Sequence, residues 1–400
     1  MSTEKIVISG TGCALADFLY NDVSFEGVGF KKYRSEQSGD GGLSPGKLVF
    51  TEELERFFDQ PYREILTGII GNRQPEAFNV GGPSLVSLIH AAQMLEEDYF
   101  EVKFFGLAGK DETAHKIFEI VQTTPLCIEN YLTTSSKATP FTDVFSDSTY
   151  EGGHGERTFV NNIGAAWEYS PEHLNDSFFE SQIVCFGGTA LVPQIHDDLT
   201  NLLTRAKNNH CITLVNTVFD FRNERNNPGN PWPLVNSLED YDKIDVLIMD
   251  CEEALKISGQ QSIEKAADFF ASTMVSSFII TNGANDIYAK SMGGIFGETT
   301  MIRLPVSEKV KLDLKSTPES RGDTTGCGDN FTGGIIASLA HQLQTRSKGQ
   351  FDLCEAISWG VASGGFICYI VGGTYLEKQP GDKRKRVAEL QKEYLQQIEN

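Results

Sequence analysis

The chain has 400 residues and a formal net charge of −21 at pH 7. That length allows two domains or one large α/β unit with an appendage. Such a negative balance would repel a phosphate backbone, so nucleic acid is not expected as a partner. No apolar run approaches the roughly 18 residues of a membrane span, and the N-terminal sequence lacks the pattern of a signal peptide. These features predict a cytoplasmic protein with no membrane partner.

Apolar segments bounded by turn residues alternate with segments of helical period along most of the chain. The pattern predicts strands at 5–12, 100–109, 181–188, 211–218, 244–250 and 276–284, and helices at 84–97, 112–122, 197–208, 263–274 and 381–400. This alternation favours a mostly parallel sheet with helices on both faces, a three-layer α/β sandwich.

Two regions, 18–50 and 124–163, interrupt the alternation. Both are rich in β-forming residues, Gly, Ser and Thr, and show no helical period. They predict a small β layer that projects from the main sheet. The eight cysteines are scattered singly with no CxxC pair, which predicts reduced thiols rather than a disulfide framework or a zinc site.

Two common nucleotide signatures are weak or missing. The phosphate loop GxxxxGK[ST] does not occur. Gly10 and Gly12 follow the first strand as in a dinucleotide fingerprint, but Leu15 occupies the third glycine position. A partial fingerprint of this kind is more often a tight turn, so a nicotinamide-linked oxidoreductase is only an alternative.

The stretch DTTGCGDNFTGG, residues 323–334, is the most informative segment. Gly326, Cys327 and Gly328 precede a helix predicted to begin near Asp329, so their N–H groups can converge on an anion at the helix N-terminus. Asp329 beside that anion suits a general base that faces a substrate hydroxyl. The alternative is that Asp329 only caps the helix and the glycines only serve the turn.

This stretch resembles the C-terminal signature DTxGAGDxFxGG of the ribokinase-like sugar kinases, also called the phosphofructokinase-B family. Cys327, at the usual alanine, is its one departure. The resemblance implies a ribokinase-like fold, a small β lid over the substrate, ATP as phosphoryl donor and Mg²⁺. It implies that Gly326 to Gly328 form the anion hole for the γ-phosphate and that Asp329 is the catalytic base. Asp323 and Thr325 fall at a monovalent-cation position, with K⁺ as the candidate ion.

Other segments resemble the family in the expected order. Asp17 falls where members hold a substrate hydroxyl, although an acid facing water would look the same. Gly81 and Gly82 fall on the GGxxxNxA segment, with Val86 in place of its Asn. Arg157 is placed on a strand that returns from the lid, where it could meet a charged substrate group or simply be a solvated edge residue.

The resemblance also assigns the ATP and metal positions. Thr281, Asn282 and Gly283 resemble the family's T-x-G-x-x-G nucleotide segment, although its second glycine is absent. Asp250 and Glu253 fall on the NxxE motif that helps place magnesium, through water. An exposed acidic helix start is an equal alternative for these two residues.

The acceptor class stays open between two candidates. The resemblance puts a sugar first, which predicts an ATP-dependent carbohydrate kinase acting on an alcohol group. Leu15 and Val86 make the acceptor pocket more apolar, and GERTFVNNIGAA, residues 155–166, is similar to the lid-return strand of adenosine kinases. A nucleoside kinase is therefore the main alternative, and a non-catalytic sugar-binding protein is a further one. The resemblance also allows a homodimer formed through the lid.

Overall fold

The computed structural model describes residues 5–37, 39–95, 99–153, 155–317, 322, 324–345 and 349–399. A nine-stranded sheet of order β14-β13-β12-β11-β10-β9-β1-β5-β6 forms its centre. All pairs from β12 to β6 are parallel, and β13 and β14 add an antiparallel edge. The strands are β1 Ile6–Gly12, β5 Phe100–Gly109, β6 Cys127–Thr134, β9 Ile183–Gly187, β10 Ile212–Asn216, β11 Val246–Asp250, β12 Ser277–Thr281, β13 Ile287–Ser291 and β14 Ile302–Leu304.

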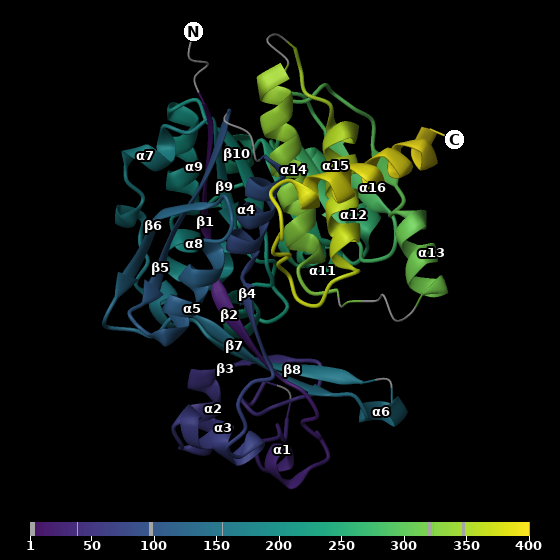
Figure 1. Cartoon of the computed structure of the whole chain (residues 1–400). Helices are drawn as coiled ribbons and strands as arrows, with labels where there is room; N and C mark the ends of the chain where they lie inside the picture. The colour runs from purple at the N-terminus through teal and green to yellow at the C-terminus, as the bar shows by residue number, and fades with distance from the viewer. Residues whose placement is uncertain are drawn as a thin grey trace.

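Helices cover both faces of this sheet, so the predicted three-layer sandwich is confirmed (Figure 1). One face packs against α4 Pro83–Met94, α5 Glu112–Val121, α14 Cys327–Thr345, α15 Leu353–Ile367 and α16 Asp382–Glu399. The other packs against α7 Asp176–Phe179, α9 Leu199–Asn208, α11 Cys251–Ser258 and α12 Ile263–Ser272. A further helix, α13 Glu308–Ser316, contacts α16.

The central strands are apolar on both faces because both faces are buried. In β11, Val246 and Ile248 pack toward the α14 side, while Leu247 and Met249 pack toward the α12 side. Side chains alternate across a strand, so two covered faces require a continuous apolar run rather than a polar alternation. The pattern VLIM in the sequence therefore reports a central parallel strand.

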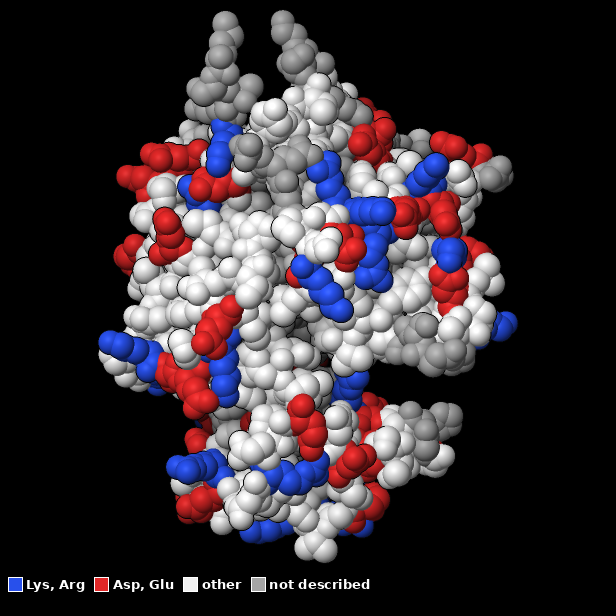
Figure 2. Space-filling model, viewed as in Figure 1, with Lys and Arg blue, Asp and Glu red and all other residues white. Residues whose placement is uncertain are grey.

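A second, five-stranded sheet of order β3-β8-β7-β2-β4 forms the lower lobe in Figure 1. Its strands are β2 Leu15–Tyr20, β3 Leu48–Phe50, β4 Ala77–Gly81, β7 Phe141–Asp147 and β8 Glu156–Asn162. One of its faces packs against α1 Val28–Lys32, α2 Thr51–Phe58 and α3 Tyr62–Ile70. Figure 2 shows a notch between this lobe and the main body, with acidic and basic side chains mixed over the face in view.

The bounds of this lobe differ from those predicted from the β-rich regions. Residues 127–134 form β6, which pairs with β5 at the edge of the large sheet. Residues 51–81, outside the predicted regions, supply α2, α3 and β4 to the lobe. Local composition detects strands but does not reveal their pairing partners, which lie far away in the sequence. Across the described residues, no helix is both long and apolar enough to cross a membrane.

Candidate active site

The carboxyl ends of the parallel strands meet at one edge of the large sheet. Gly12 pairs with Gly187, which pairs with Asn216, and Asp250 pairs with Thr281. The second sheet continues directly from this edge, because β2 follows β1 after two residues. In open α/β sheets, ligands bind outside the carboxyl ends of the strands. The candidate site residues are expected here, between the two sheets.

Gly10 and Gly12 serve packing at this edge rather than a dinucleotide fingerprint. A Cβ at Gly10 would lie 2.5 Å from Leu88 Cδ1, and a Cβ at Gly12 would lie 1.8 Å from Gly187 O. The first glycine lets α4 approach β1, and the second lets two strand ends touch. Both glycines lie within β1, so the tight-turn interpretation of the motif is wrong as well. Close packing accounts for them, which weakens the oxidoreductase alternative.

Gly326, Cys327 and Gly328 form a turn, here called the glycine turn, at the start of α14. The helix begins at Cys327, two residues earlier than predicted. Gly326 has φ +73°, and a Cβ there would lie 2.5 Å from Gly373 Cα. A Cβ at Gly328 would meet nothing within 4 Å. Cys327 N already donates to Thr324 O at 3.3 Å. First-turn N–H groups of a helix otherwise lack an acceptor in the preceding turn, so the open side of Gly328 suits an anion.

A buried polar network, missed in the sequence analysis, holds the glycine turn from behind. Asn330 is fully buried and donates from Nδ2 to Gly326 O and Gly373 O, both at 2.8 Å. Its Oδ1 can only accept, so His90 Nδ1, 2.7 Å away, carries the proton. Lys383 Nζ lies 3.4 Å from the same oxygen and donates to Gln93 Oε1 at 2.8 Å.

This network joins four helices, since its members come from α4, α14 and α16 and His90 Nε2 accepts from Ser363 of α15 at 2.8 Å. Burial lowers the pKa of His90 well below its usual value, and the nearby Lys383 adds to the effect. The only sequence signal was a lone histidine and glutamine within the apolar segment of α4, which does not identify their partners.

Asp329 is half-buried and lies in the first turn of α14, after the glycine turn. Its position inside the helix argues against a simple N-cap. Burial raises the pKa of Asp329 to about 6. Burial raises the pKa of the Cys13 thiol, and the nearby charges of Asp329 and Asp17 raise it further. The charge of Asp329 also contributes to the raised pKa of Glu253, so Asp329 lies near both groups. The structure therefore brings the predicted base, the predicted acceptor aspartate and the predicted metal glutamate to one place.

Asp17 lies on β2 against the turn that leads into α4. A Cβ at Gly81 would lie 2.4 Å from Asp17 Oδ2, and a Cβ at Gly82, where φ is +93°, would lie 2.6 Å from Cys13 O. Two backbone N–H groups of α4, those of Ser84 and Leu85, donate to the same Cys13 oxygen. The two glycines thus allow the start of α4 to approach the strand that carries Asp17.

Arg157 of β8 reaches from the second sheet to the glycine turn. Its Nη1 donates to Thr325 Oγ1 at 3.2 Å. The contact shows that the second sheet reaches the segment that leads into α14. Asp323, the other residue of the predicted monovalent-cation position, lies outside the described residues.

Asp250 and Glu253 form a reciprocal cap at the start of α11. Glu253 N donates to Asp250 Oδ1 at 2.8 Å, and Glu253 Oε2 accepts from Asp250 N at 3.0 Å and from Thr217 Oγ1 at 2.5 Å. Burial, then the charge of Asp250, raises the pKa of Glu253 to about 8. A divalent cation would relieve this repulsion, so the pair fits a magnesium site.

Such a magnesium site would need ligands beyond the protein. In the part of the chain that the structure describes, no group of three or more His, Cys, Asp or Glu side chains is arranged to hold a metal. Water and phosphate oxygens commonly complete the coordination of Mg²⁺. The helix-cap interpretation and the metal interpretation of these residues are therefore compatible.

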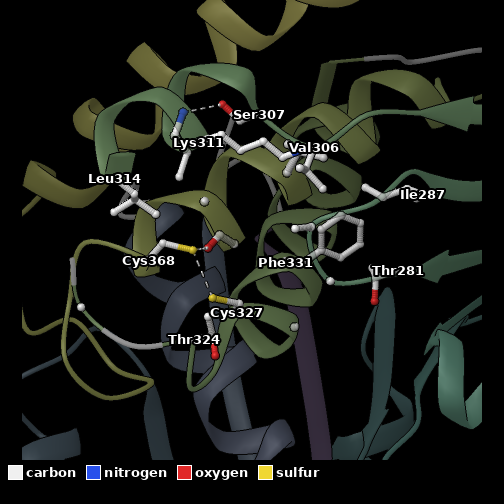
Figure 3. Close-up of a pocket in the computed structure, with 18 of the residues that line it drawn as sticks. Thr281, Ile287, Val306, Ser307, Lys311, Leu314, Thr324, Cys327, Phe331 and Cys368 are labelled. Carbon is white, nitrogen blue, oxygen red and sulfur yellow. Dashed lines mark hydrogen bonds between the residues drawn. The ribbon is translucent and has the colours of Figure 1, made fainter. Parts of the chain in front are cut away.

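A cavity of about 670 Å³ opens beside the glycine turn (Figure 3). It brings the predicted nucleotide residues Thr281 and Gly283 to the same space as Cys327 and Gly328. Asn282 lies between the first two in the chain but does not line the cavity. The remaining walls are mainly apolar and were not predicted individually: they include Ile287, Val306, Val310, Leu314, Phe331 and Val361. The size and the apolar lining suit a flat organic ring.

Residues 68–378 match the model of the pfkB family of carbohydrate kinases. The chain belongs to the pfkB family. Solved structures with the same fold include the adenosine kinase from Sinorhizobium meliloti, with TM-score 0.68 and 17% identity over 96% of this chain and 99% of that one.

Two other kinases share this fold, with similar TM-scores and sequence identities. The Anopheles gambiae adenosine kinase, in complex with P1,P4-di(adenosine-5) tetraphosphate, has TM-score 0.64 and 20% identity over 90% of this chain and 95% of its own. Ribokinase from Thermotoga maritima has TM-score 0.61 and 17% identity, covering 97% and 99%. The TM-scores over nearly the whole length of both chains establish the ribokinase-like fold, and the family membership supports a kinase.

Proposed function

We propose that this pfkB-family protein transfers the γ-phosphoryl group of ATP to a hydroxyl of a small sugar or sugar-bearing acceptor. One observation carries the proposal: Asp329, whose pKa is raised to about 6, lies in the first turn of α14 beside the open glycine turn and near Asp17. A base with a pKa near the working pH combines a large deprotonated fraction with enough basicity to accept a proton.

Each group in this arrangement has a distinct role. Asp17 binds an acceptor hydroxyl, and Asp329 takes the proton from the hydroxyl that attacks. The N–H groups of the glycine turn donate to the transferring phosphoryl group, where charge accumulates. The second sheet covers the edge and excludes water, which would otherwise compete as acceptor. Arg157, already in contact with the turn through Thr325, supplies positive charge at the same place.

The donor nucleotide is assigned to the 670 Å³ cavity. Its apolar walls suit the adenine ring, and Thr281 and Gly283 lie at the carboxyl end of β12 facing the glycine turn across it. Asp250 and Glu253 would hold Mg²⁺ through water. The cation, when bound, neutralises phosphate charge that would otherwise be repelled by the surrounding carboxylates.

A nucleoside is the second candidate for the acceptor, and a second cavity supports it. This cavity of about 520 Å³ has apolar walls from Phe50 of the second sheet, Ile163, Leu191 and Phe221. Charged side chains also line it: Glu52, Glu53, Arg56, Lys137, Arg222 and Arg225. Phe50 pairs with Asn161, which pairs with Thr142, which pairs with Asp17, so Phe50 and Asp17 lie in one row across the second sheet. Apolar side chains on the same sheet row as the acceptor aspartate suit a base attached to a ribose better than a ring of free hydroxyls.

ADP formation measured across a panel of free sugars, substituted sugars and nucleosides tests the proposal. We expect one class to support turnover, and Asp329→Asn to lower kcat with that acceptor by roughly 10²–10⁴ while ATP binding changes little. Asp268→Asn, at an exposed aspartate of α12, is the matched control and should behave as wild type. Turnover by Asp329→Asn within a few fold of wild type would remove the base assignment.

A further inference from the structure

Two cysteines from different helices meet in the wall of the large cavity. Cys327 is the first residue of α14 and the middle residue of the glycine turn, and Cys368 directly follows α15. Their Sγ atoms lie 3.5 Å apart, as the dashed line in Figure 3 shows, and both side chains line the cavity. Forty residues separate them in the sequence, so their contact is a product of the fold.

Tight packing of the two helices holds these thiols together. A Cβ at Gly364 of α15 would lie 2.9 Å from Cys327 O, and Cys368 Sγ lies 3.7 Å from Gly364 O. A glycine is therefore required where α15 crosses the start of α14. The S–S bond of a disulfide is about 2.05 Å long, so the two sulfurs need to approach by only about 1.5 Å.

We propose that Cys327 and Cys368 form an oxidisable dithiol that closes as a disulfide in the wall of the nucleotide cavity. Reactive cysteines are typically partly exposed and near positive potential, such as a helix N-terminus. Cys327 meets both conditions, because it is half-buried and begins a 19-residue helix. The adjacent cavity gives a small oxidant access to both sulfurs.

The oxidant is a peroxide, with hydrogen peroxide as the simplest case. The Cys327 thiolate attacks one peroxide oxygen, the O–O bond breaks, and the products are a sulfenic acid and water once a proton is taken up. The Cys368 thiol then attacks the sulfenic sulfur, forms the S–S bond and releases a second water. Both thiols are thereby oxidised by two electrons in total, and the peroxide is reduced to two water molecules.

The disulfide would disturb the glycine turn directly. It joins the first residue of α14 to the residue after α15 and moves Cys327 toward Cys368. This shift displaces the N–H groups of the glycine turn, which are assigned to the phosphoryl group. We therefore expect oxidation to weaken ATP binding and phosphoryl transfer. Formation of the disulfide does not depend on the proposed function, whereas loss of kinase activity rests on it.

The test treats the full-length protein with hydrogen peroxide and analyses three properties. Peptide mapping under non-reducing conditions should find a Cys327–Cys368 cross-linked peptide. ATP affinity and ADP-forming activity should both fall, by roughly tenfold or more for loss of donors in the turn, and both should recover with dithiothreitol. ATP affinity is measured directly, so it reports on the dithiol even if no acceptor supports turnover.

Variants separate this pair from the other thiols, each compared with its own reduced form. Cys327→Ala should resist peroxide. In Cys368→Ser the Cys327 sulfenic acid has no partner thiol, so no cross-link forms, and dithiothreitol should restore less ATP affinity because the sulfenic acid oxidises further to a sulfinic acid. Cys354→Ser, which removes another half-buried thiol of α15, should be as sensitive as wild type and recover as fully. Absence of the cross-linked peptide after inactivating oxidation would overturn the proposal. Cross-linking that leaves ATP affinity unchanged, or a Cys327→Ala variant as sensitive to peroxide as wild type, would overturn it as well. If either serine or alanine variant fails to fold, the wild-type peptide map and ATP affinity still decide.

Discussion

Lys383 offers a test of the network behind the glycine turn, because its effect on stability should change sign with pH. The side chain is 1% exposed, and burial lowers its pKa from 10.5 to about 7, with Glu377 acting in the opposite direction. One pKa unit corresponds to about 1.4 kcal/mol, so keeping this lysine charged in the fold costs roughly 5 kcal/mol. His90, whose pKa is lowered well below 6.5, stays neutral across the pH range considered.

The pH dependence follows from which state binds the proton. The folded-state pKa lies below the unfolded value, so between pH 7 and 10.5 the unfolded chain holds a proton that the folded chain lacks. Stability contributed by Lys383 therefore rises with pH through this window. The penalty is fully present below pH 7 and disappears above 10.5.

Lys383→Met removes the penalty but also removes a donor from Gln93 Oε1 and Asn330 Oδ1. Losing a donor to a buried acceptor costs about 1–3 kcal/mol. At pH 6 the variant should therefore be more stable than wild type by roughly 2–4 kcal/mol, the difference between the two effects. Near pH 10, where about 0.8 kcal/mol of the penalty is still present, the variant should be less stable than wild type by up to about 2 kcal/mol because of the lost hydrogen bonds.

Urea unfolding at pH 6 and near pH 10, followed by tryptophan fluorescence, measures this difference. Lys385→Met is the matched control, because Lys385 is an exposed lysine two residues further along α16. It should leave stability nearly unchanged at both pH values. A difference between wild type and Lys383→Met that is the same at both pH values would refute the assignment of a buried lysine with a lowered pKa.

Three further predictions concern the site itself. The kcat/KM of the wild-type protein should rise with pH through about 6 as Asp329 of the free enzyme loses its proton, and a kcat/KM profile without this rise would contradict its role. Glu253→Gln should raise the magnesium concentration for half-maximal rate, measured by titration; an unchanged requirement would leave Glu253 as a helix cap alone. Gly328→Ala should lower kcat but leave the unfolding midpoint near that of wild type, since the added Cβ points into open space. Gly326→Ala should instead destabilise the fold by about 1–3 kcal/mol, because φ is +73° at this residue and the added Cβ would contact Gly373. Equal unfolding midpoints for the two alanine variants would contradict the backbone conformation described for the glycine turn.

The sequence predicted the central sheet and its helices because both depend on local patterns. The apolar run VLIM in β11 and the helical spacing of apolar residues in α4 both indicate buried side chains. The segment DTTGCGDNFTGG allowed the site to be predicted because this one short motif contains both the glycine turn and Asp329. Functional residues can be predicted from a sequence when they lie next to one another in a short motif.

The features that the sequence did not reveal depend on contacts between distant segments. His90, Asn330 and Lys383 meet only after four helices have packed, and no spacing in the sequence relates 90 to 383. The same reason explains β6, which has the composition of the β-rich regions but pairs with β5 in the large sheet. Composition gives a strand, whereas pairing is decided by tertiary structure.

Cys327, within the glycine turn, and Asn330, behind it, connect the turn to neighbouring helices, and neither side chain is assigned the acceptor or its proton. Cys327 departs from the alanine of the resembling signature, and Asn330 occupies a position that the signature leaves open. Cys327 contacts Cys368 at the end of α15, while Asn330 contacts Gly373 and, through Lys383, α16. A change at either contact moves the turn without altering Asp329 or Gly328. The response of this site to oxidation is therefore expected to depend on Cys327, which departs from the shared motif, whereas the pH dependence of catalysis depends on Asp329, which belongs to it.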